Sequence, residues 1–79
     1  MEAEQPPPVN EEYDPTENDE KVLNVLKEGR ANPLHIREES GLAKQRVNES
    51  LERLRSAGWV RKVTRGLYEL VEDPRERRE

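Results

Sequence analysis

The sequence predicts an α+β fold in which three helices are followed by a two-stranded β-hairpin. Apolar residues recur at spacings of three and four in the first part of the chain, and β-forming residues gather from Trp59 onward. Glycines punctuate these segments at Gly29, Gly41, Gly58 and Gly66. A chain of 79 residues has room for one such domain.

The first helix is expected to begin near Thr16 or Asn18 and to end at Gly29. Either polar side chain can accept a hydrogen bond from an unpaired amide at the helix start. One apolar stripe follows, made of Val22, Leu23, Val25 and Leu26. Arg30 and Ala31 then form a connector or a strand of one or two residues.

A second helix is predicted over about 33–40 and a third over about 44–57. Asn32 is a good N-cap, Pro33 suits the first helical position, and Gly41 can take the left-handed conformation that stops a helix. Only three residues, Gly41 among them, separate the two helices, which is typical of a helix-turn-helix. Val47, Leu51 and Leu54 give the third helix one buried face.

After Gly58 the pattern changes to two short runs of β-forming residues separated by Thr64-Arg65-Gly66. Gly66 can supply the positive φ of a hairpin turn, and Trp59 is expected in the core. Alternation is imperfect in both runs, so the pattern predicts the hairpin better than its register. The order of elements is that of a winged helix-turn-helix.

Charge and composition divide the chain into three parts. Residues 1–17 are acidic and proline-rich and are expected to be a disordered tail, residues 18–72 form the domain, and residues 73–79 are a charged, disordered end. The net charge is −4, but the segment 42–66 carries seven bases and two acids. An acidic protein overall can therefore still present a locally basic surface to a nucleic acid.

The segments Asn32-Pro33-x-x-Ile36, Val47-x-x-x-Leu51-x-x-Leu54, Ala57-Gly58-Trp59-Val60 and Gly66-Leu67-Tyr68 together resemble winged-helix transcription regulators of archaea and bacteria. The similarity is greatest to the repressor-like proteins of halophilic archaea that are related to the phage phi-H repressor, and it spans about residues 19–71. That family often has Ser or Thr where Ala43 stands, so the third helix is expected to lack a hydroxyl cap. The resemblance implies a regulator, repressor-like in type, that binds double-stranded DNA.

Helical geometry indicates which residues of the third helix would meet DNA. Opposite the buried face lie Gln45, Glu49 and Arg53, flanked by other polar side chains. Glutamine can pair with adenine, arginine with guanine, and glutamate can accept from cytosine or orient a neighbouring arginine. The predicted contacts on this helix are Lys44, Gln45, Arg46, Asn48, Glu49 and Arg53. The predicted contacts in the hairpin are Arg61, Lys62, Thr64 and Arg65. Basic side chains there can follow the DNA backbone or enter the minor groove.

Other functions fit the sequence less well. With no cysteine, one histidine and no glycine-rich phosphate loop, the chain shows no catalytic, metal or cofactor site, and it is not expected to be an enzyme. No apolar run is long enough to cross a membrane and no secretory signal is present, so a cytoplasmic protein is expected. Eighteen acids with only four lysines are compatible with adaptation to salt. A weak homodimer and a winged-helix module that binds proteins within a larger assembly remain alternatives.

Overall fold

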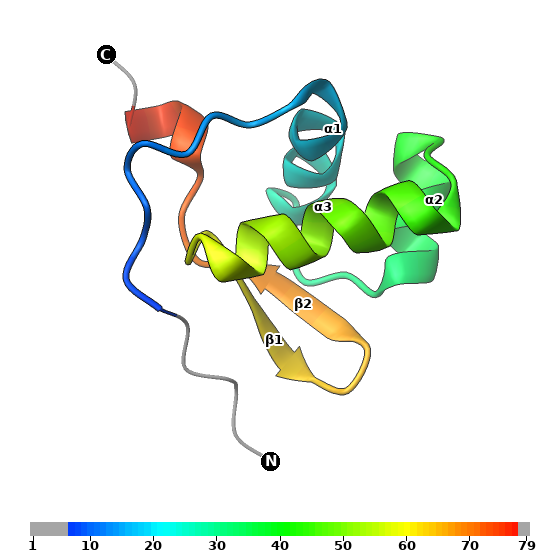
Figure 1. Ribbon diagram of the computed structural model, residues 1–79. Coiled ribbons are helices and arrows are strands. Elements are labelled where there is room, and N and C mark those ends of the chain that lie inside the picture. The colour runs from blue at the N-terminus through cyan, green and yellow to red at the C-terminus, as the bar shows by residue number, and fades with distance from the viewer. Residues whose placement is uncertain (1–6, 78–79) are drawn as a thin grey trace.

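The structure, a computed structural model, describes residues 7–77. Its elements are α1 (Glu17–Leu26), α2 (Pro33–Ser40), α3 (Lys44–Ser56), β1 (Val60–Thr64), β2 (Leu67–Leu70) and a 3-10 turn, Pro74–Arg77. The three helices pack against one another, and the antiparallel hairpin of β1 and β2 extends beside α3 (Figure 1). The predicted winged helix-turn-helix is confirmed.

Most helix ends use the residues that the sequence suggested, but α1 ends at Leu26 with Lys27 as its C-cap, three residues before the expected Gly29. Thr16 is the N-cap of α1: its hydroxyl accepts from the amide of Asp19, and the Asp19 carboxylate accepts from the amide of Thr16. This reciprocal capping box decides between Thr16 and Asn18 as the start. At α2, Asn32 Oδ1 accepts from the amide of His35 at 2.7 Å, and Gly41 closes the helix with φ of 77°.

One hydrophobic core joins the helices to the base of the hairpin. Trp59 is its largest member and is 1% exposed, as expected for a tryptophan that follows a helix stop. The other buried apolar residues are Val22, Leu23, Val25, Leu26, Ala31, Ile36, Val47, Leu51, Leu54, Ala57 and Val60. Because α3 buries one complete face in this core, its opposite face is fixed toward solvent.

The hairpin contains an irregularity that explains its imperfect alternation. Arg61 pairs with Glu69 and Lys62 with Tyr68, but the register shifts before Thr64 pairs with Leu67. An extra residue in one strand moves the side chains beyond it to the other face, so no simple alternation can describe the run. Ala31 adds an isolated bridge to β2, with two backbone hydrogen bonds of 2.9 Å to Tyr68.

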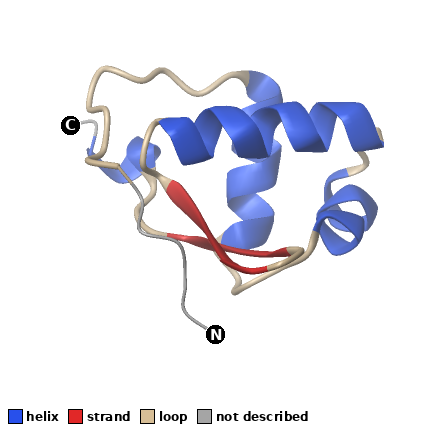
Figure 2. Cartoon of the chain, turned by 60° about the horizontal axis from the view of Figure 1, so that its bottom comes forward, coloured by secondary structure: helices blue, strands red, loops and turns tan. Residues whose placement is uncertain are grey.

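The described part of the N-terminal segment is packed, in contrast to the disordered tail expected for residues 1–17. Val9 and Tyr13 pack against the core, and the amide of Asn10 donates to the carbonyl of Ala57 at 2.8 Å. The segment runs along the C-terminal end of α3 before it reaches α1 (Figure 2). These two apolar side chains anchor the segment, and the average composition of residues 1–17 does not reveal their role. Residues 1–6 lie outside the described part.

The C-terminal end also departs from the expectation for residues 73–79. Asp73 is buried, and its carboxylate is 2.7 Å from Arg75 Nη2. Arg75 Nη1 donates in turn to Asn24 Oδ1 of α1 at 2.8 Å. The ion pair and this contact attach the 3-10 turn to the first helix, while residues 78–79 are not described.

Candidate nucleic-acid interface

The N-terminal half of α3 presents a row of polar side chains to solvent. Lys44, Gln45, Arg46 and Asn48 are all exposed, whereas Val47, which lies among them in the sequence, is buried with Leu51 and Leu54. Ala43 is the N-cap and makes no side-chain hydrogen bond, as the sequence suggested. The first amides of α3 are therefore not capped by a side chain, and they add a partial positive charge to this end.

Glu49 lies in the middle of this row and accepts from two of its neighbours. Gln45 Nε2 is 3.2 Å from Glu49 Oε2, and Arg46 Nη1 is 3.3 Å from Glu49 Oε1. The helical spacing of three and four residues brings all three side chains onto one face. Glu49 is thus hydrogen-bonded to Gln45 and Arg46, two of the other DNA contacts predicted on this helix.

Arg53 is placed differently from the other predicted contacts on α3. Its Nη2 lies 2.8 Å from Asp19 Oδ1 and 3.2 Å from Ser50 Oγ. Asp19 is fully buried, and its other oxygen also accepts from the hydroxyl of Tyr13. The structure therefore groups Arg53 with α1 and the N-terminal segment, not with the solvent-facing row.

The ionisation of this cluster follows from its contacts. Burial alone would raise the pKa of Asp19, but the hydrogen bonds from Tyr13, Arg53 and the Thr16 backbone outweigh it and lower the pKa of this carboxyl. Burial, followed by the hydrogen bond to Asp19, raises the pKa of Tyr13 to about 12. At neutral pH the cluster is a carboxylate between a guanidinium and a neutral phenol.

The basic side chains of the hairpin make different contacts within the protein. Arg65 is exposed in the turn, whereas the Lys62 ammonium lies 5.9 Å from the centre of the Tyr68 ring. Arg61 forms an ion pair with Glu69, which also accepts from Arg30 Nε at 2.8 Å. These contacts, with that from Arg30 the strongest, lower the pKa of Glu69.

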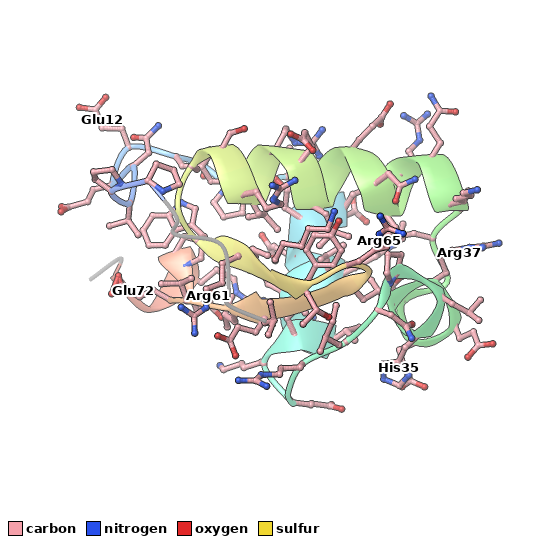
Figure 3. The ribbon with its side chains drawn as sticks, turned by 90° about the horizontal axis from the view of Figure 1, so that it is seen from below. Glu12, His35, Arg37, Arg61, Arg65 and Glu72 are labelled. Atoms are coloured by element: carbon pink, nitrogen blue, oxygen red, sulfur yellow. The ribbon has the colours of Figure 1, made fainter. Side chains whose placement is uncertain are left out.

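The labelled side chains show two ends of the hairpin with different surroundings. Arg65 lies at the tip, on the side of the molecule where α3 begins, and Arg61 lies toward the opposite end (Figure 3). Arg37 of α2 is exposed and lies on the same side as Arg65. Arg37 is not among the DNA contacts predicted from the sequence, which lie on the third helix and the hairpin.

A family model described as the sugar-specific transcriptional regulator TrmB matches residues 11–74. The chain belongs to the TrmB family. This membership makes it a DNA-binding transcriptional regulator, and its winged-helix fold agrees with that. No curated protein and no solved structure matched the chain.

The TrmB match begins within the packed N-terminal segment and ends at the start of the C-terminal turn. The match therefore extends beyond both ends of residues 18–72, the domain expected from composition. Within residues 7–77 no helix is long and apolar enough to span a membrane. The same residues contain no cluster of three or more side chains suited to a metal ion.

Proposed function

We propose that this TrmB-family chain is a sequence-specific, repressor-like regulator that inserts α3 into the major groove of double-stranded DNA and lays its hairpin along the backbone or minor groove. The observation that carries the proposal is the solvent-facing row Lys44, Gln45, Arg46 and Asn48 at the start of α3. In helix-turn-helix docking, this part of the helix is the one that reaches base edges.

Each member of the row offers chemistry that suits DNA. Gln45 and Asn48 carry an amide, which can pair with adenine N6 and N7. Arg46 can donate to guanine O6 and N7, and Lys44 stands where a phosphate would meet the first turn of the helix. Together these side chains supply both discrimination between bases and attachment to the backbone.

In the hairpin, the same proposal gives the leading role to Arg65, with Lys62 and Thr64 beside it. Arg61 would have to exchange its contact with Glu69 for a phosphate, which lowers its net contribution. Arg53 serves the interface by fixing α3 against α1, since its guanidinium is bound to Asp19. Arg37 extends the basic surface on the side of α2.

The closer likeness to the phage phi-H repressor group remains part of the proposal. It agrees with the excess of acids and the small number of lysines, which suit a protein that works in concentrated salt. Phosphate contacts weaken as salt rises, so such a regulator depends more on base contacts.

Fluorescence anisotropy with a labelled random-sequence duplex, followed over a range of salt concentrations, tests the proposal. We expect affinity to fall steeply with salt, and we expect Lys44→Ala/Arg65→Ala to reduce the logarithmic slope by about two. Lys21→Ala, an exposed lysine on α1, is the matched control and should change the slope by less than one. Absence of duplex binding at low salt would instead favour a protein-binding module.

A further inference from the structure

Glu49 occupies the centre of the exposed row on α3 and uses both carboxylate oxygens. Oε2 accepts from the Gln45 amide at 3.2 Å and Oε1 from the Arg46 guanidinium at 3.3 Å. The Glu49 side chain is 42% exposed, so it is accessible from the face that would meet DNA.

These two bonds restrict how the neighbouring side chains can present their polar atoms. Because Nε2 of Gln45 gives one proton to Glu49, the remaining proton and Oε1 are left as one donor and one acceptor. That pair is complementary to N7 and N6 of adenine. Arg46 likewise gives one proton and keeps its other donors for O6 and N7 of guanine.

The charge of Glu49 has a second effect. A carboxylate at the centre of a surface that approaches DNA repels phosphates, and this repulsion acts on every sequence alike. The hydrogen bonds to Gln45 and Arg46 benefit only duplexes whose bases fit the arrangement. The repulsion is the same for every duplex and cancels in the ratio of specific to non-specific affinity, so it is the better-ordered reading that raises this ratio.

We propose that Glu49 is a specificity-determining positioning residue, which orients Gln45 and Arg46 for base reading while its charge lowers the affinity for every duplex alike. This inference rests on the proposed function, since it assumes that α3 enters the major groove. Glu49 acts through its neighbours, and direct acceptance from cytosine N4 is the competing role.

Selection from a randomised duplex library tests this inference on the full chain. The wild type is compared with Glu49→Ala and with Glu52→Ala, a matched control that removes an exposed acid from the same helix. Thermal melting establishes that each variant is folded. Affinities are then measured for the selected duplex and for a random duplex.

For Glu49→Ala we expect tighter binding to the random duplex and a loss of about tenfold in the ratio of specific to random affinity. In the selected duplexes, the sequence preference of Glu49→Ala should weaken at the same base pairs at which Gln45→Ala and Arg46→Ala weaken it. Gln45→Ala should have less effect when Glu49 is already alanine. Glu52→Ala should reproduce only the change in random affinity.

Three outcomes overturn the inference. An unchanged affinity ratio in Glu49→Ala would show that Glu49 has no part in specificity. Loss of preference at one separate cytosine-containing pair would assign it direct readout. If the wild type bound no duplex at all, the proposed function itself would fail, a result distinct from both of the others.

Discussion

Arg53 Nη2 lies 2.8 Å from Oδ1 of the fully buried Asp19, 34 residues earlier in the chain. The pair links the last turn of α3 to the capping box at the start of α1, and the Tyr13 hydroxyl also donates to Asp19. The orientation of the exposed row on α3 is therefore set by polar contacts as well as by the core. Arg53 is one of the DNA contacts predicted from the sequence, and because its guanidinium is bound to Asp19 we propose that it positions the helix.

Arg53→Met should lower the free energy of unfolding by about 1–3 kcal/mol, because it leaves the buried Asp19 without its cation. The lower part of that range is expected, since the arginine side chain is 42% exposed and its charge is partly screened. Denaturant unfolding measures the change. Arg46→Met is the matched control, since its ion pair with Glu49 lies on the surface, where the two side chains are 60% and 42% exposed. Equal losses in both variants would contradict the positioning role of Arg53.

The lowered pKa of Asp19 makes its contribution depend on pH. A carboxyl whose pKa is lower in the folded state stabilises the fold above its unfolded pKa of about 3.9, and this stabilisation is lost as pH falls through the folded value. Glu69 and Asp73 also have lowered pKa values, so the wild type is compared with Asp19→Asn. The difference in free energy of unfolding should be constant from pH 7 to 5 and shrink below pH 4. A difference that stays constant in acid would argue against an ionised Asp19 in the folded state.

Gly58 is required by its surroundings as well as by its backbone. Its φ is 85°, and an added Cβ would lie 2.6 Å from the carbonyl oxygen of Pro7. Gly66 has a similar φ of 77° and open space around it, so it provides the control. We expect Gly66→Ala to cost about 1–2 kcal/mol from backbone strain alone. Gly58→Ala should cost more and should speed proteolysis within residues 7–15.

Equal costs for the two alanines, with unchanged proteolysis, would mean that the N-terminal segment does not press on Gly58. Thermal melting and limited proteolysis on the same samples separate the two effects.

The order of the elements, the other helix boundaries and Trp59 in the core were predictable because each depends on local spacing and capping chemistry, but the end of α1 at Leu26 was not, since Gly29 was expected to end it. The contact between Asp19 and Arg53 was not, since nothing in helical periodicity relates residues on separate helices. The ion pair between Arg61 and Glu69 was not predictable either. It follows from the strand register, which the sequence pattern does not reveal because the hairpin contains a bulge. Val9 and Tyr13 were missed because two apolar residues hardly change the composition of an acidic segment.

Base-reading and backbone contacts should respond differently to salt. Gln45→Ala or Arg46→Ala should reduce affinity for a selected duplex at both low and high salt, because base hydrogen bonds are little screened. Lys62→Ala should matter mainly at low salt, where release of counterions contributes most. Titrations at two salt concentrations measure this contrast. Equal losses for all three variants at high salt would contradict the division of roles.

The most direct measurement is an amide chemical-shift titration of the full chain with a random-sequence duplex. If α3 and the hairpin form the DNA interface, shifts should concentrate in residues 43–49 and 61–66, with little change around Asp19 and Tyr13. Absence of shifts, or shifts confined to α1 and the N-terminal segment, would contradict a DNA interface on this face.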